Sequence, residues 1–179
     1  MIHVVAFALG LFAWTFLEYI LHRWFHTARG RNLASREHLR HHGRPDWFTP
    51  LLPKALVLAA IIATSAALST VLAGAAIAAT FAGGIALAFF GYDALHRRAH
   101  LKAPRNRYGA RVRARHFHHH FSAPDMNHGV TTSLWDRVFG TYQEPALVPV
   151  PKKHAHALAW VLDQNGAIAA RFADRYRLV

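Results

Sequence analysis

Cysteine is absent from the 179-residue chain. This absence excludes disulfides, thiolate metal sites and cysteine nucleophiles, so any bound metal must have nitrogen or oxygen ligands. Acidic residues are scarce, with 9 Asp+Glu against 21 Lys+Arg and a formal net charge of +12. Such a charge fits nucleic acid, an anionic membrane surface or an acidic protein. Because no nucleic-acid-binding motif or aromatic-interleaved basic repeat is present, we expect no nucleic-acid partner.

Lysine and arginine are missing from two long stretches, residues 1–22 and 55–95. The first stretch is apolar over about 20 residues, the length that a helix needs to cross a ~30 Å hydrocarbon core. It lacks the basic start and the small-residue cleavage site of a secretory signal, so we expect it to remain in the protein as a membrane helix.

The second stretch has 36 consecutive residues without a formal charge, from Ala55 to Phe90. As a helix these residues would extend ~54 Å, nearly two bilayer crossings, which favours a hairpin with its tip near Leu72 to Ala76. A buried hairpin in a soluble bundle is the alternative, but so small a chain shields that many uncharged residues poorly. We therefore predict an all-α integral membrane protein with a single domain, 1–179, and membrane helices at about 2–21, 55–72 and 75–95.

The basic residues predict the orientation in the membrane. If residues 22–54 and 96–179 share one side, all 21 Lys and Arg lie on that side, which the positive-inside rule identifies as cytoplasmic. We expect helical, metal-binding cytoplasmic segments at 22–54 and 96–145. The tail, 150–179, has the pattern of an amphipathic helix, lying either along the membrane interface or in solvent.

Histidine occurs 15 times, and ten histidines form two pairs and two triplets that alternate along the chain. Members of a pair are four residues apart and share a helix face, and each triplet has the spacing His-x-x-His-His. The ten are His22 and His26, then His38, His41 and His42, then His96 and His100, and finally His116, His119 and His120. Ten imidazoles are too many for one ion, so they indicate two neighbouring metals. Neutral nitrogen ligands favour iron, copper, zinc or nickel.

Five motifs connect these residues with a known family: "EYILHRWFH", "HLRHH", "YDALHRRAH", "HFHHHF" and "NHGVTTSLWDRVFGTY". Over about residues 14–142 the chain resembles the membrane fatty acid hydroxylase/sterol desaturase superfamily, and most closely its fatty acid 2-hydroxylase branch. The resemblance carries the ten histidines over as metal ligands. It excludes the other five, and we expect His118 to be solvated or to lie just outside the ligands. The five are His3, His118, His128, His154 and His156.

The resemblance implies O2-dependent hydroxylation of an aliphatic membrane lipid, in the first place a fatty acyl chain, by two iron ions for which zinc can substitute. Neutral imidazole ligands leave such a centre electron-poor, which suits an oxidant. Alternatives within the superfamily are a lipid desaturase and a carotenoid or sterol hydroxylase. A non-catalytic metal-binding membrane protein is the alternative of a different class.

Some relatives carry a fused haem-binding cytochrome domain that this sequence lacks. The resemblance therefore implies a separate electron donor, a reductase or a ferredoxin-like protein, and we expect Arg97, Arg98 and Arg115 to contribute to its docking surface. The family often has four membrane helices where this sequence shows three. A homodimer would be one way to replace the fourth.

Four residues are expected to surround the ligands, because a ligating histidine commonly donates its other N–H to an acceptor. These candidates are Glu18, Asp93, Asn127 and His128. Asp93 is the strongest, since it lies three residues before His96 and the preceding "YD" belongs to the resemblance. Glu37, beside His38, is a further candidate. For Asp136 we expect a structural role.

Overall fold

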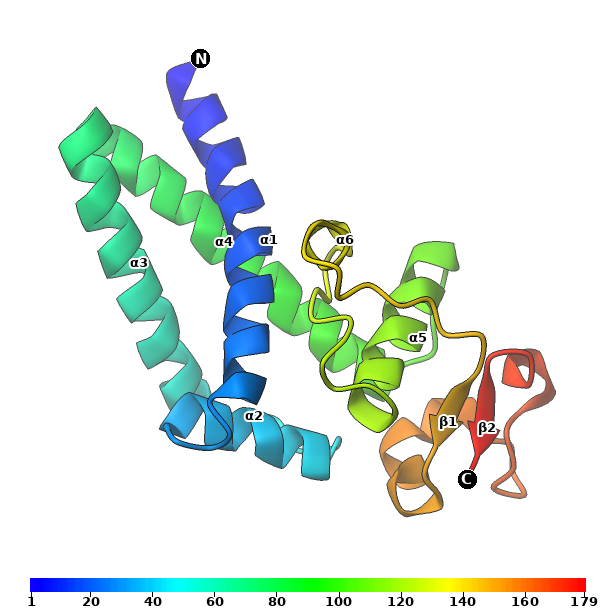
Figure 1. Cartoon of the computed structure of the whole chain (residues 1–179). Helices are drawn as coiled ribbons and strands as arrows, with labels where there is room; N and C mark the ends of the chain where they lie inside the picture. Colours follow the sequence, from blue (N-terminus) through cyan, green and yellow to red (C-terminus); the bar gives the residue numbers. More distant parts are fainter.

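The computed structural model describes the whole chain, residues 1–179, as a mainly helical protein (Figure 1). Five long helices account for most of it, followed by a short helix, two 3₁₀ helices and two short strands. In chain order the elements are α1 (Ile2–Thr27), α2 (Leu33–Gly43), α3 (Leu51–Ala73), α4 (Ala75–Leu101), α5 (Arg107–Phe121), α6 (Leu134–Val138), β1 (Val148–Val150), η1 (Lys152–Val161), η2 (Ala170–Phe172) and β2 (Tyr176–Leu178).

Three helices are long and apolar enough to cross a membrane, namely α1, α3 and α4. This confirms the fold class that the uncharged stretches predict. α3 and α4 form the expected hairpin, and its turn lies at Gly74, which has a φ of 81°. Only glycine adopts that conformation without steric cost, so the turn falls where the sequence allows it. α1 and α4 extend beyond the predicted bounds at the ends that carry their histidines, and α3 begins earlier than predicted, at Leu51.

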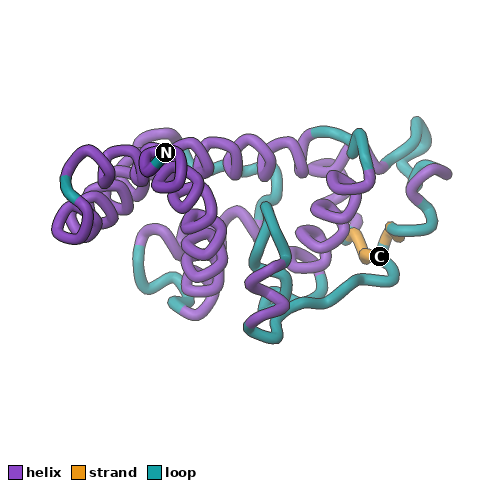
Figure 2. Tube along the Cα trace, turned by 90° about the horizontal axis from the view of Figure 1, so that it is seen from above, coloured by secondary structure: helices purple, strands orange, loops and turns teal.

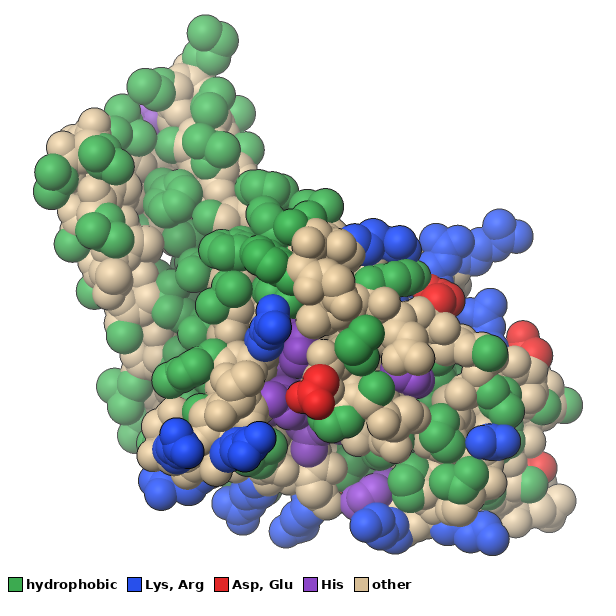
Figure 3. All heavy atoms as spheres, in the orientation of Figure 1, with side chains coloured by type: hydrophobic (Ala, Val, Ile, Leu, Met, Phe, Trp, Pro, Cys, Tyr) green, Lys and Arg blue, Asp and Glu red, His purple; other side chains and the backbone are tan.

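The surface of α3 supports its placement in lipid. Leu68 is 66% exposed, and Val71 and Leu72 are each 86% exposed. Figure 3 shows apolar side chains covering the arms that α1, α3 and α4 form at one end of the molecule. A soluble bundle would bury such residues, because burial of an aliphatic side chain stabilises the fold by about 1.5–3 kcal/mol relative to its exposure to water.

α1 and α4 cross with their backbones in contact at Gly10 and Gly84. A Cβ atom on Gly10 would lie 2.1 Å from the carbonyl oxygen of Phe81, and one on Gly84 would lie 2.3 Å from that of Phe7. Small residues at such a crossing allow close helix packing, which drives association within lipid. The two helices run in the same direction and separate toward the histidine-bearing end (Figure 1).

The two cap helices, α2 and α5, begin in the same way. The side chain of Asn32 accepts a hydrogen bond from Ser35 N, and that of Asn106 accepts one from Gly109 N. Both asparagines therefore satisfy a free backbone N–H at a helix start. α1–α2 and α4–α5 are thus two similar helix–turn–helix units, with α3 between them in chain order.

The C-terminal segment differs from the predicted helix, and the expectation of a helical tail is wrong. It forms η1, η2 and a two-stranded parallel sheet in which Val148 pairs with Tyr176, at one side of the molecule (Figure 2). Prolines at 149 and 151 and the left-handed Gly166 disfavour a continuous α-helix. Leu158 and Val161 are buried in a cluster around Phe117 of α5, so the apolar face of the tail packs on the protein.

A matched pair of glycine substitutions tests the α1–α4 crossing. We expect Gly84→Ala to lower the thermal unfolding temperature of the detergent-purified protein, because the new methyl group overlaps the α1 backbone and overpacking costs about 1–3 kcal/mol. Gly83→Ala, whose Cβ would meet no atom within 4 Å, should leave the temperature unchanged or raise it slightly. Equal unfolding temperatures for the two variants would show that the crossing is loosely packed.

Candidate metal centre

The ten predicted histidines converge into two groups of five. In each group the nearest ring nitrogens all lie within 4.8 Å of one another. The first histidine group consists of His22, His26, His38, His42 and His119. The second histidine group consists of His41, His96, His100, His116 and His120. Every residue that the spacing predicts as a ligand is therefore in one of two clusters that could hold a metal ion.

Each group draws on both halves of the chain. The first group takes two pairs spaced by four residues from α1 and α2 and one histidine, His119, from α5. The second group takes two such pairs from α4 and α5 and one histidine, His41, from α2. In each triplet the outer residues share a helix face, and the middle residue lies about 60° from the first and about 100° from the last, which directs it toward the other group.

Distances within the groups match metal ligation. Nε2 of His26 lies 2.8 Å from Nε2 of His38 and 3.1 Å from that of His119. In the second group, Nε2 of His100 lies 2.7 Å from Nε2 of His116. Adjacent imidazole nitrogens on one metal, each about 2.0–2.1 Å from it, are separated by about 3 Å.

Several buried nitrogens in these groups have no hydrogen-bond partner in the chain. They include Nε2 of His22 and His42 in the first group and Nε2 of His120 in the second. A buried polar atom without a partner costs free energy, and such atoms are rare in folded proteins. A metal ion in each group would satisfy them, so the residues fit the metal centre that the resemblance implies.

Backbone carbonyls fix the orientation of three rings. Nδ1 of His22 lies 2.5 Å from the carbonyl oxygen of His128, Nδ1 of His119 lies 2.7 Å from that of Met126, and Nδ1 of His41 lies 2.6 Å from that of Trp47. A carbonyl oxygen only accepts, so in each case Nδ1 carries the hydrogen. Nε2 is then left with a free lone pair that faces the group, as a metal ligand requires.

Burial keeps the imidazoles of the cap helices neutral, which is the form that binds a metal. Removal from water lowers the pKa of His41 to about 4. The same cause, with further lowering by neighbouring imidazoles, holds the pKa of five others well below its ordinary value: His38, His42, His116, His119 and His120.

The residues expected around the ligands lie close to the groups, in varied roles. His128 contacts the first group through its carbonyl oxygen and its ring. Glu18 is buried and accepts hydrogen bonds from Val130 N and Thr131 N. Asp93 forms an ion pair with Lys54 instead of contacting a histidine.

Asn127 and Asp136 hold backbone segments. The side chain of Asn127 donates to the carbonyl oxygen of Gln143 and accepts from Gln143 N. Asp136 accepts from His128 N and Gly129 N, which is the structural role expected for it. Glu37 accepts a hydrogen bond from the Trp47 indole and is next to Arg40.

His118 lies outside both groups and is buried, which agrees with the second of its two expected placements, just outside the ligands. One expectation needs correction. Arg115 is also buried and cannot contribute to an exposed docking surface, whereas Arg97 and Arg98 are exposed. Sequence reasoning also missed Lys54 and the carbonyl groups of Trp47 and Met126. Every residue type has a backbone carbonyl group, so the sequence alone cannot indicate that those of Trp47 and Met126 accept hydrogen bonds from histidines.

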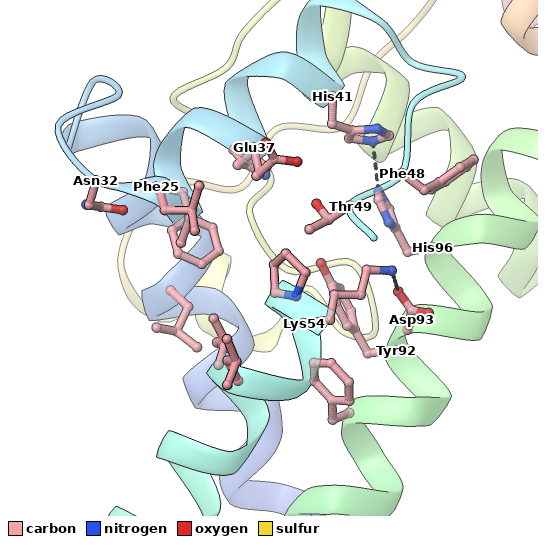
Figure 4. Close-up of a pocket in the computed structure, with 18 of the residues that line it drawn as sticks. Phe25, Asn32, Glu37, His41, Phe48, Thr49, Lys54, Tyr92, Asp93 and His96 are labelled. Atoms are coloured by element: carbon pink, nitrogen blue, oxygen red, sulfur yellow. Dashed lines mark hydrogen bonds and ion pairs between the residues drawn. The ribbon is translucent and has the colours of Figure 1, made fainter. Parts of the chain in front are cut away.

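A cavity of about 480 Å³ leads to both groups. Helices α1 to α4 and the segment between α2 and α3 line it, and His38, His41 and His96 form part of its wall (Figure 4). Most of its other lining is apolar, including Leu21, Val57 and Phe89. The charged groups there are Glu37 and the Lys54–Asp93 pair.

Fold and site together define a membrane protein with a histidine-rich candidate dimetal centre beside an apolar cavity. The chain belongs to the fatty acid hydroxylase family, whose model matches residues 7–141. It is 34% identical over 155 residues to a dihydroceramide fatty acyl 2-hydroxylase of Arabidopsis thaliana, a match that covers 84% of this chain and 64% of the relative.

Other relatives are similar over the same region. Identity is 33% to the fatty acid 2-hydroxylase of Mus musculus, over 75% of this chain and 38% of the relative. It is 31% to a ceramide very long chain fatty acid hydroxylase of Schizosaccharomyces pombe, over 77% of this chain and 42% of the relative. The chain therefore spans between about two fifths and just under two thirds of the length of these curated relatives. No solved structure matches it significantly.

Adjacent histidines in one run provide a test of the metal centre. We expect the purified wild-type protein to bind two equivalents of a divalent transition metal. His119→Ala should lose one of them, because the first group then has only four imidazoles and a void where the fifth ring was. His118→Ala, a change in the preceding residue of the same helix, should retain both equivalents. Metal content after gel filtration, measured by mass spectrometry, distinguishes these outcomes, and equal losses in both variants would contradict the assignment.

Proposed function

We propose that this chain is the catalytic core of a membrane-bound, O2-dependent di-iron hydroxylase that acts on the aliphatic chain of a lipid, with a fatty acyl chain as the favoured substrate. The observation that carries the proposal is the position of the two histidine groups at the wall of an apolar cavity between membrane helices. The names of the relatives, which describe hydroxylation of fatty acyl groups, support the substrate class.

The donor set accommodates iron, which we propose as the native metal. Each group offers five imidazole nitrogens, without a cysteine and without a carboxylate among the five. Such ligands suit iron, copper or zinc far better than magnesium or calcium. Two iron ions bound there would supply the redox chemistry that activates O2. The protein contributes the fixed ring orientations, the neutral charge state and the exclusion of water.

The cavity supplies the approach for the substrate. Trp24 of α1 and Leu56 of α3 both line it and are exposed on the outer surface of the helices, at 48% and 63%. An acyl chain in the bilayer therefore has an apolar path between α1 and α3 toward His38, His41 and His96. Apolar walls with a few polar groups are typical of sites that bind small lipophilic ligands.

Hydroxylation inserts one oxygen atom of O2 into a C–H bond and reduces the other to water, which consumes two electrons and two protons. We propose that a separate donor, such as a reductase or ferredoxin-like protein, supplies these electrons. Lys and Arg gather at the end of the molecule opposite the apolar arms (Figure 3). The positive-inside rule therefore supports a cytoplasmic metal centre, where a soluble donor has access.

Turnover by the reconstituted protein tests the proposal. Anaerobic loading with ferrous iron, followed by a reductant, O2 and fatty acyl lipids, should yield a product one oxygen atom heavier than the substrate by mass spectrometry. A product two hydrogen atoms lighter would identify a desaturase instead. His41→Ala should abolish the product, while His154→Ala, outside both groups, should retain it. Full metal content without any product would favour the non-catalytic alternative.

A substitution in the cavity separates substrate access from metal binding. We expect Val57→Phe to narrow the cavity and lower turnover of a long acyl chain by about tenfold, with unchanged metal content. Leu68→Phe, at an exposed site farther along α3, is the matched control and should have wild-type turnover. If both variants keep wild-type rates, the substrate reaches the metals by another route.

A further inference from the structure

One loop supports two rings of the first histidine group. We call Met126 to Thr131 the clamp loop. The carbonyl oxygen of Met126 accepts from His119 Nδ1 at 2.7 Å, and that of His128 accepts from His22 Nδ1 at 2.5 Å. His22 and His119 come from two different helices, α1 and α5. The clamp loop therefore fixes the protonation pattern and the orientation of both rings at once.

Glu18 anchors one end of the clamp loop from α1, one helical turn before His22. One of its carboxylate oxygens accepts from Val130 N at 2.6 Å and from Thr131 N at 2.9 Å. The other accepts from the Thr131 hydroxyl at 2.5 Å. Glu18 is 3% exposed, and a buried carboxylate makes strong hydrogen bonds. The helix that carries His22 thus also holds the loop that orients it.

Asp136 and Asn127 anchor the rest of the loop. Asp136 accepts from His128 N and Gly129 N, each at 2.8 Å, and is 1% exposed. Asn127 has a left-handed backbone, with a φ of 59°, and two side-chain hydrogen bonds to Gln143. A Cβ on Gly129 would lie 2.1 Å from the carbonyl oxygen of Thr132, so the loop has no room to shift there.

The second histidine group has fewer hydrogen bonds of this kind, one ring against two. Only His41 donates to a carbonyl oxygen, that of Trp47. Nδ1 of His100, His116 and His120 is buried without a hydrogen-bond partner in the chain. These rings are held by packing alone, which leaves their tautomers and orientations less restricted. The two groups have the same number of imidazoles and differ in their outer hydrogen bonds.

We propose that the two groups bind metal with unequal affinity, and that the clamp loop, anchored by Glu18 and Asp136, makes the first group the tighter site. Pre-organised ligands lose less freedom on binding, and removing the partner of a ligating histidine commonly costs 10–100-fold in affinity. Glu18 and Asp136 are then positioning residues that act through His22 and His119. This inference rests on the dimetal centre proposed above.

Zinc titration of the metal-free, detergent-purified protein against a chromogenic chelator tests the proposal. The wild type should show one tight and one weaker site. Glu18→Ala should weaken the tight site by about 10–100-fold and leave the weaker one unchanged. Thr131→Val, which removes a single hydroxyl group from the anchor, should act in the same direction by a smaller factor, and it remains informative if Glu18→Ala fails to fold. Glu144→Gln is the matched control, because this exposed carboxylate contacts only Tyr142.

Two ligand variants assign the sites. His120→Ala should retain the tight site, and His42→Ala should retain the weaker one. Two equal sites in the wild type, or equal weakening of both sites in Thr131→Val at unchanged metal-free thermal stability, would overturn the inference and leave the dimetal proposal intact. A wild-type protein that binds no zinc, iron or cobalt would overturn the dimetal proposal itself.

Discussion

The backbone contact between α1 and α4 sets the distance between the histidine pairs that these two helices carry. Gly10 and Gly84 meet there, and each helix carries its histidine pair twelve and sixteen residues later, at His22 and His26 and at His96 and His100. At 1.5 Å per residue the first pair member lies ~18 Å beyond the crossing. Because the helices separate at a fixed angle from one tight point, the distance between the two pairs is determined before the cap helices add their ligands.

The two halves of the protein follow one plan. Gly10, His22, His26 and Asn32 recur 74 positions later as Gly84, His96, His100 and Asn106. The triplets recur 78 positions apart, so α5 has four more residues, about one helical turn, between its cap and its histidines. The clamp loop orients two rings of the first group, whereas the carbonyl oxygen of Trp47 orients a single ring, His41, of the second. The two halves are therefore alike in their candidate ligands and differ in the hydrogen bonds that orient those ligands.

The sequence predicts the membrane helices and the set of ten histidines because both depend on local spacing: uncharged runs long enough to cross a bilayer, and residues four apart on one helix face. It does not predict how the ten histidines are distributed between the two groups. The placement of His41 and His119 in the group of the opposite half depends on how α2 and α5 cross, which is a tertiary property. Asp93 pairs with Lys54, 39 positions away, for the same reason. The tail departs from the predicted helix because its backbone breaks at Leu158, with a φ of −118°, and at the left-handed Gly166.

The exchange of His41 and His119 has a consequence for biosynthesis. The chain emerges from its N-terminus, so α1 and α2 are complete well before α5 exists. At that stage the first group has four of its five imidazoles and lacks His119, and the clamp loop that orients His22 does not yet exist. The second group is also incomplete until His120 is made. Neither candidate metal site is therefore complete before α5 has been made. Metal capture is coupled in this way to the completion of the fold, and a truncated chain offers no finished site to the metal ions of the cell.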